Sequence, residues 1–182
     1  EQLGLDFDTV FSNTNTSYEP DEAGRSSGKT GSDIERILAF HAIGRKDPVE
    51  YQQEWSEVLR HALSIQTEYM DSIYRNKLTE LQYQVTRNSA TERAFTGLYD
   101  KHFVSGNYYC ICCHHMLFTS DSKYNSGCGW PAFHTEDKNA AISRITDYSH
   151  GMVRTEVKCS KCDAHLGHVF NDGPNGKPRY CI

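Results

Sequence analysis

The chain has 182 residues, of which 37% are hydrophobic and 24% are charged, so it is long enough for one ordinary folded domain and an extension. Its formal net charge of -5 and its lack of lysine or arginine runs argue against electrostatic attachment to nucleic acid or to an anionic membrane surface. No apolar stretch approaches the ~20 residues that a membrane-spanning helix needs.

The first segment of the chain, residues 1–31, is rich in Ser, Thr, Asn, Gly and acidic residues and has only scattered apolar groups. Such a segment buries too little apolar surface to offset the entropy lost on ordering. We therefore expect a disordered or loosely attached tail.

A first helix is predicted where the polar texture ends. Ser32 is a candidate N-cap because Glu35 follows three residues later, as in a capping box, and apolar residues at helical spacing come after it. Gly44 then ends the helix, since glycine readily takes the left-handed conformation beyond a helix C-terminus.

A second, longer helix is predicted from about residue 48 to residue 75, opened by Pro48. Apolar and aromatic residues recur every three or four positions from Trp55 to Ile73, which is the pattern of an amphipathic helix. We interpret this face as a packing surface. The alternative is a surface that tethers the protein to a partner.

From Leu78 onward the sequence changes to a short helical piece, residues 78–87, followed by short runs of alternating or aromatic residues. These runs are NYYCICC, HMLFT, AISRIT, MVRTEV and HVF, and they predict short antiparallel strands joined by long loops. The predicted fold class is α+β. A small, mostly antiparallel β domain of two sheets, residues 78–182, follows a helical N-terminal extension, residues 32–77.

Four of the seven cysteines form two C-x-x-C pairs separated by a long excursion of the chain. Two residues between thiolates let a tight turn aim both sulfurs at one tetrahedral ion, so the pairs predict one structural Zn²⁺ per chain. A redox role for a C-x-x-C pair is the rival interpretation, but the presence of two pairs favours zinc. The predicted ligands are Cys110, Cys113, Cys159 and Cys162.

The neighbours of these pairs receive subordinate roles. Lys158 and Lys161 each lie next to a cysteine of the second pair and could offset the negative charge of the thiolates. We interpret Cys112 as a small buried hydrophobe and treat His114 and His115 as ordinary polar residues. Metal-type cysteine spacing favours a reducing compartment, so we expect an intracellular, cytoplasmic protein. An organelle is the alternative, because the chain begins at Glu1 rather than at methionine and could have lost a targeting segment.

The cysteines left over are Cys112, Cys128 and Cys181. Cys128 lies in SGCGWPAF, between two glycines, and Cys181 lies in RYCI, two residues after Arg179. Upstream of RYCI the segment AHLGHVFNDGP carries two histidines three residues apart. A cysteine reacts as the thiolate, and nearby arginine or histidine lowers its pKa, so Cys181 has plausible activators close in the chain.

Taken together and in this order, these motifs resemble the B-type methionine sulfoxide reductases, enzymes that reduce the R epimer of methionine sulfoxide. The resemblance covers residues 78–182. It begins with LTELQYQVTRNSATERAFTG and includes both C-x-x-C pairs, SGCGWPAF, GMVRTEV, AHLGHVFNDGP and RYCI.

The resemblance implies a role for each matching position. It implies that Cys181 is the catalytic cysteine, that Cys128 is the resolving cysteine, and that His168 and His165 are active-site histidines, with His168 the better candidate for protonating the sulfoxide oxygen. Further implied pocket residues are Arg179, Asp172, Trp130, which packs against the S-methyl group of the substrate, and Phe133, which adds an apolar wall.

The implied reaction leaves a sulfenic acid on Cys181, which condenses with Cys128 to a disulfide that thioredoxin reduces. The implied context is protein repair under oxidative stress by a monomer acting on free or protein-bound substrate. Family members usually continue after RYCI with an asparagine and a serine, so we expect the sequence to lack the end of its domain. The alternative function is a non-catalytic, zinc-ribbon-like binding module, which has no need for the thiol of Cys181.

Overall fold

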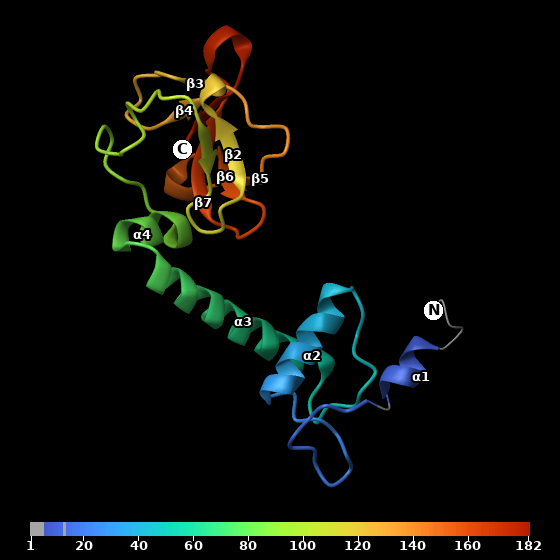
Figure 1. The fold of residues 1–182 in the computed structure, drawn as a ribbon. Coiled ribbons are helices and arrows are strands. Elements are labelled where there is room, and N and C mark those ends of the chain that lie inside the picture. Colours follow the sequence, from blue (N-terminus) through green and yellow to red (C-terminus); the bar gives the residue numbers. More distant parts are fainter. Residues whose placement is uncertain (1–5, 13) are drawn as a thin grey trace. The chain divides into compact units, whose positions relative to one another are not determined.

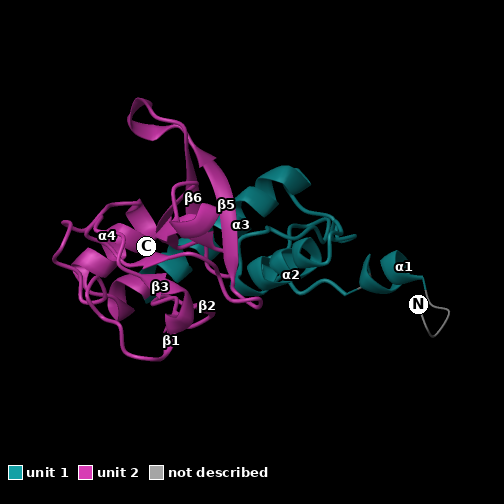
Figure 2. Ribbon diagram, turned by 90° about the horizontal axis from the view of Figure 1, so that it is seen from above, with its two compact units in different colours: residues 1–73 teal, residues 74–182 magenta. Residues whose placement is uncertain are grey.

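The computed structural model describes residues 6–12 and 14–182 and divides into two compact units, residues 1–73 and residues 74–182 (Figure 2). The helices are α1 (Phe7–Ser12), α2 (Gly31–Ala42), α3 (Trp55–Lys77) and α4 (Glu80–Asn88). Strands follow the helices along the chain and pair in antiparallel fashion in two sheets. This architecture confirms the predicted α+β class with a helical N-terminal part.

The N-terminus of α2 is capped two residues earlier than the sequence predicted. Thr30, not Ser32, is the N-cap, and it exchanges hydrogen bonds with Asp33 in a capping box. Asp33 also accepts hydrogen bonds from the hydroxyls of Ser17, Ser26 and Ser27. Although burial raises the pKa of Asp33, these hydrogen bonds outweigh it and keep the pKa below its usual value.

The same hydrogen bonds give residues 14–30 a defined place in the first unit. The segment was expected to be loosely attached because it lacks apolar residues, but polar side chains hold it instead. Ser26 is buried and its backbone pairs with Tyr51. Residues 1–5 and 13 of the expected tail lie outside the described residues.

Helix α3 begins at Trp55 rather than near Pro48. The reason is Asp47, which is fully buried and accepts hydrogen bonds from the Arg36 guanidinium at 2.6 and 2.8 Å and from the Tyr51 hydroxyl at 2.7 Å. Its carboxylate also accepts from the backbone N–H of Val49, which holds the chain in an irregular turn. This polar network outweighs the helical preference of residues 48–54.

Only the first part of the apolar face of α3 packs as predicted. Val58 and Ala62 are buried against Ile37 of α2, whereas Tyr69 and Ile73 are exposed. Along the described parts of the chain, no helix combines the length and the apolar character that crossing a membrane requires.

The second unit contains a two-stranded and a six-stranded antiparallel sheet (Figure 1). The small sheet pairs β1 (Asn107–Tyr109) with β2 (Met116–Thr119). In spatial order, the large sheet comprises β3 (Lys123–Tyr124), β4 (Ala132–Phe133), β8 (Arg179–Cys181), β7 (His165–Phe170), β6 (Arg154–Cys159) and β5 (Ile142–Asp147). The sequence patterns predicted β1, β2, β5, β6 and β7. They missed β3, β4 and β8, which are too short to show a period of two.

Helix α4 lies against β7 and carries the capping box that the segment 78–87 contains, with Thr79 as N-cap and Gln82 as its partner. The core of the unit is aromatic: Phe118 stacks on Phe133 with ring centroids 4.3 Å apart, and Tyr180 packs beside them. Because Tyr180 belongs to β8, the core anchors the strand that carries Cys181.

Candidate active site

Two cysteine sulfurs meet at the centre of the large sheet. The Sγ of Cys128, in the loop between β3 and β4, lies 3.5 Å from the Sγ of Cys181 on β8. Both residues are half-buried. A disulfide needs a sulfur–sulfur distance of about 2.05 Å, so a shift of about 1.5 Å would join them.

Strand β8 is an interior strand, and this position determines what surrounds Cys181. Cys181 pairs with Ala132 on β4 and with His168 on β7, and the backbone N–H of Ile182 donates to the carbonyl of Pro131 at 2.9 Å. Directly paired residues point to the same face of a sheet, so His168 shares the face of Cys181. Glu156 on β6, which pairs with His168, extends the same row.

Phe133 does not share this face. It pairs with Tyr180, is 1% exposed and stacks in the core on the opposite side of the sheet. The structure therefore places Phe133, expected as an apolar wall beside the substrate, in the core on the face opposite Cys181. Neighbouring residues of a strand point to opposite faces, and the sequence did not reveal that Phe133 lies in a strand.

Gly167 lets β7 approach the end of β8 closely. Its φ of +148° lies in the region that only glycine adopts readily, and a Cβ at this position would lie 2.0 Å from the carbonyl oxygen of Cys181. The glycine between the two histidines of HLGH thus determines how near Cys181 lies to β7.

Each histidine of β7 is held by a carboxylate. His168 Nε2 lies 2.7 Å from Asp147 Oδ2, which also accepts from Arg154, and His165 Nδ1 lies 2.5 Å from Glu156 Oε1. Hydrogen bonds from Ser149, and then from His168, keep the pKa of Asp147 well below its usual value, so it stays ionised. A carboxylate partner orients the imidazole ring.

The sequence interpretation missed Asp147, Arg154 and Glu156. Arg154 and Glu156 alternate in the strand pattern VRTEV, so their common face was recognisable. That this face is the face of Cys181 follows only from the pairing of three strands, β6, β7 and β8.

Arg179, two residues before Cys181, forms a bidentate ion pair with Asp172 at 2.9 and 2.8 Å. Its guanidinium lies over the ring of Phe170, 4.5 Å from the centroid. The hydrogen bond from Arg179 lowers the pKa of Asp172, and the pair raises the pKa of Arg179 further. Arg179 thus presents a fixed positive charge on the strand of Cys181.

The two thiols differ in acidity. Burial, together with the neighbouring Cys128, raises the pKa of Cys181 to about 12, and Arg179 only partly opposes this rise. Burial also acts to raise the pKa of Cys128, but hydrogen bonds from Ser126 at 3.0 Å and from the backbone outweigh it and lower that pKa. Cys181 consequently holds its proton in the free protein, and Cys128 ionises first.

Trp130 lies in the same loop as Cys128, two residues further along the chain. Its indole N–H donates to the carbonyl of Glu92 at 3.1 Å, and the backbone N–H of Phe95 donates to the carbonyl of Gly129 at 2.7 Å. Residues 92–95 thereby brace the loop that holds Cys128, and they leave Trp130 half-buried.

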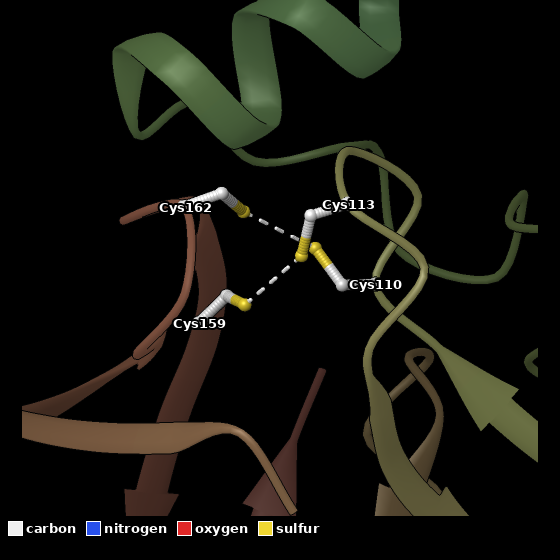
Figure 3. Close-up of side chains that lie close together, drawn as sticks. All are labelled: Cys110, Cys113, Cys159 and Cys162. Carbon is white, nitrogen blue, oxygen red and sulfur yellow. Dashed lines mark hydrogen bonds between the residues drawn. The ribbon is translucent and has the colours of Figure 1, made fainter.

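The other four cysteines form a separate cluster (Figure 3). Their sulfurs all lie within 4.8 Å of one another, with Cys110 and Cys162 at 3.6 Å and Cys113 and Cys159 at 3.5 Å. Tetrahedral zinc with Zn–S bonds of about 2.3 Å places its sulfur ligands about 3.8 Å apart. The four residues therefore fit a zinc ion, as their spacing in the sequence predicted.

The two C-x-x-C turns have the same backbone geometry. In each, the carbonyl of the first cysteine accepts from the N–H four residues later, at 2.8 Å for Cys110 and 2.9 Å for Cys159. In each, that fourth residue, His114 or Asp163, has a φ near +60°. Matching turns aim both pairs of sulfurs at one point, which Figure 3 shows.

Positively charged side chains from helices contact the backbone of the two turns. Lys77 donates to the carbonyl of Cys112 and Arg87 to that of Cys162, both at 2.7 Å, whereas Lys158 pairs with Asp163. Cys112 is 3% exposed and belongs to the core, as predicted. The imidazole Nδ1 of His115 lies 3.3 Å from Cys113 Sγ, a contact that the sequence interpretation did not foresee.

Comparison with known proteins bears on the second unit. The family described as the SelR domain matches residues 78–182. The peptide methionine sulfoxide reductase MsrB of Cellvibrio japonicus is 49% identical over 121 residues, which cover 66% of this chain and 86% of that protein. The MsrB proteins of Hahella chejuensis and Pseudomonas syringae pv. syringae are each 54% identical, covering 62% and 60% of this chain and 81% and 84% of their own lengths.

Proposed function

Because this chain belongs to the SelR domain family of peptide methionine sulfoxide reductases, we propose that it is an oxidoreductase that reduces the R epimer of methionine sulfoxide, free or in proteins, to methionine. Residues 78–182 form the reductase domain, and residues 32–77 are a helical extension. The observation that carries this proposal is the approach of the Cys128 and Cys181 sulfurs to 3.5 Å on a sheet face that also holds His168.

The first step transfers one oxygen atom. The Sγ of Cys181 attacks the sulfoxide sulfur, the S–O bond to the substrate breaks, and the oxygen ends on Cys181 as a sulfenic acid while methionine leaves. The cysteine sulfur is oxidised by two electrons and the substrate sulfur is reduced by two. The sulfoxide oxygen must gain a proton to leave, and the thiol of Cys181 must lose one.

His168 is suited to move this proton. It lies directly across from Cys181 and is held by ionised Asp147, so it can protonate the oxygen and recover the proton that Cys181 releases. The high pKa of Cys181 supports such a coupled transfer, because the thiol keeps its proton until a substrate arrives. Arg179 stabilises the thiolate, Asp172 holds Arg179, and Trp130 supplies the surface for the S-methyl group.

The second step regenerates the thiols. The thiol of Cys128 attacks the sulfenic sulfur of Cys181, water leaves, and a disulfide forms. Hydrogen bonding that lowers the pKa of Cys128 favours this attack, since the thiolate is the nucleophile. A dithiol protein of the thioredoxin class then reduces the disulfide. This cycle fits a monomeric enzyme of protein repair under oxidative stress in a reducing intracellular compartment.

The metal in this proposal is structural. Cys110, Cys113, Cys159 and Cys162 would hold one Zn²⁺ per chain, and four thiolates leave no open position for water. The bound ion would join two turns that lie far apart in the sequence, and its binding free energy would stabilise the fold.

The decisive experiment compares the wild type with Cys181→Ser on the two separated epimers of a methionine sulfoxide derivative. We expect the wild type to reduce the R epimer only and the variant to reduce neither. Failure of both proteins to reduce either epimer would instead favour a non-catalytic zinc-ribbon-like binding module, and equal measurable rates would refute the role of Cys181.

A second variant separates the two steps. Cys128→Ser should release one methionine per chain and then stop when thioredoxin is the reductant. Continued turnover of this variant would show that the enzyme is recycled without Cys128.

A further inference from the structure

Tyr124 lies in the row of side chains that contains Cys181. It pairs with Ala132 on β4, Ala132 pairs with Cys181 on β8, and Cys181 pairs with His168 on β7. All four residues therefore point to the same face of the sheet. Only the methyl group of Ala132 separates the tyrosine side chain from Cys181 along this row.

The hydroxyl of Tyr124 is buried and has no hydrogen-bond partner among the described residues. The ring of His134 is its neighbour, with centroids 6.3 Å apart, but no hydrogen bond joins the two side chains. Buried hydroxyls nearly always have a partner, because an unpaired one loses its hydrogen bonds to water without replacement. An unpaired hydroxyl beside reactive groups points to a partner that arrives with the substrate.

The surroundings of the Tyr124 side chain keep its hydroxyl protonated, so that it can donate a hydrogen bond. Burial raises the pKa of Tyr124, and the charges that act on it are those of Arg179, Asp172, Cys128 and Cys181. The phenol is thus protonated at neutral pH and lies among the groups of the proposed active site.

We propose that the hydroxyl of Tyr124 donates a hydrogen bond to the oxygen atom that passes from the substrate sulfoxide to Cys181. This inference rests on the proposed function and adds a catalytic residue to it. Tyr124 on β3 and His168 on β7 flank Cys181 from opposite sides, so the oxygen meets a hydrogen-bond donor on each side. The phenol keeps its own proton: it stabilises the negative charge that grows on the oxygen as the S–O bond breaks, while His168 moves the proton.

The test replaces Tyr124 by phenylalanine, which keeps the ring and removes only the hydroxyl. The reaction is followed as a single turnover in the Cys128→Ser background, at saturating methionine-R-sulfoxide, so that recycling does not contribute. We expect the rate constant of methionine release to fall about tenfold, with little change in the concentration that gives half the maximal rate. The thermal midpoint should stay the same or rise, because an unpaired buried hydroxyl is removed.

The matched control is Tyr109→Phe, which removes an exposed hydroxyl from β1 of the small sheet. An unchanged rate in Tyr124→Phe would overturn the inference. An equal fall in rate in Tyr109→Phe would also overturn it. So would a fall in the rate of Tyr124→Phe together with a lower thermal midpoint, because that result would indicate a packing role. Cys181→Ser distinguishes the two levels of the hypothesis. If that variant is inactive while Tyr124→Phe retains the full rate, only the role of Tyr124 fails; if it reacts like the wild type, the proposed function itself fails.

Discussion

Replacement of Gly167 by alanine should move the Cys181 thiol, the proposed nucleophile, away from β7 without removing any side chain that the proposed mechanism uses. The added Cβ would lie 2.0 Å from the carbonyl oxygen of Cys181, and 3.0 and 3.1 Å from the carbonyl carbon of Cys181 and the Cα of Ile182. Ordinary contact begins at 3.4 Å, so the backbone of β8 would have to move away from β7 by about 1.4 Å.

The magnitude follows from the rigidity of the atoms involved. No rotamer change can relieve a contact between a Cβ and a backbone carbonyl, so the cost lies at the upper end of the range for overpacking, about 3 kcal/mol. For a unit of this size, such a loss lowers the thermal midpoint by about 10 to 20 °C. A displacement of about 1 Å at a reacting atom lowers the rate by about 100-fold.

The assay is thermal unfolding followed by circular dichroism, together with single-turnover reduction of methionine-R-sulfoxide below the midpoint of the variant. Gly106→Ala and Gly176→Ala are the controls, because a Cβ at either position meets no atom within 4 Å, and Gly176 also has a positive φ. Both controls should remain active, and only Gly176→Ala should lose some stability. A Gly167→Ala protein with the midpoint and the rate of Gly106→Ala would refute the reasoning.

Three further predictions concern the metal, the pair of thiols and the histidine. We expect close to one zinc per chain by elemental analysis, and Cys159→Ala should lose this zinc together with thermal stability. Cys112→Ala should retain the zinc, because Cys112 lies outside the cluster. Equal zinc contents in the two variants would contradict the assignment. Cys128→Ala should lower the pKa of Cys181 from about 12, because the hydrogen bond and charge of Cys128 both raise it. Alkylation of Cys181 by iodoacetamide, which requires the thiolate, should then reach its plateau at a lower pH than in the wild type, and an unshifted profile would show that burial alone controls the thiol. Asp147→Asn should slow the single turnover about tenfold, because it removes the carboxylate that orients His168. The control Asp121→Asn, at an exposed position, should not slow it. Equal rates in the two variants would show that His168 acts without Asp147.

The parts of this protein that the sequence predicted well depend on residues close together in the chain. A C-x-x-C turn aims its two sulfurs through its own backbone, so Cys110 with Cys113, and Cys159 with Cys162, were recognisable as ligand pairs. Helix α4 and the longer strands likewise follow from local periodicity and capping. The order of the motifs along the chain resembles that of a reductase family, and comparison with relatives confirmed the family.

Local sequence patterns gave wrong predictions where hydrogen bonds with residues distant in the sequence determine the backbone. The hydroxyls of residues 17, 26 and 27 donate hydrogen bonds to Asp33 and hold a segment that was expected to be loosely attached. Hydrogen bonds to the buried carboxylate of Asp47 place the start of α3 later in the chain than predicted. Strands of two or three residues, such as those that hold Phe133 and Tyr124, show no period at all. Their facing is set by the strands beside them.

By itself, then, the sequence determined the fold class and the two pairs of cysteines that fit a zinc ion, because these are encoded in residue types and short spacings. Its resemblance to a known family pointed to Cys181 and Cys128 as the proposed reactive thiols. Tertiary structure alone decided that β8 is an interior strand, and that decision placed Cys181 between Ala132 and His168 and within reach of Cys128. The physical reason is that a strand's facing depends on register, and register is fixed by hydrogen bonds between segments that lie tens of residues apart.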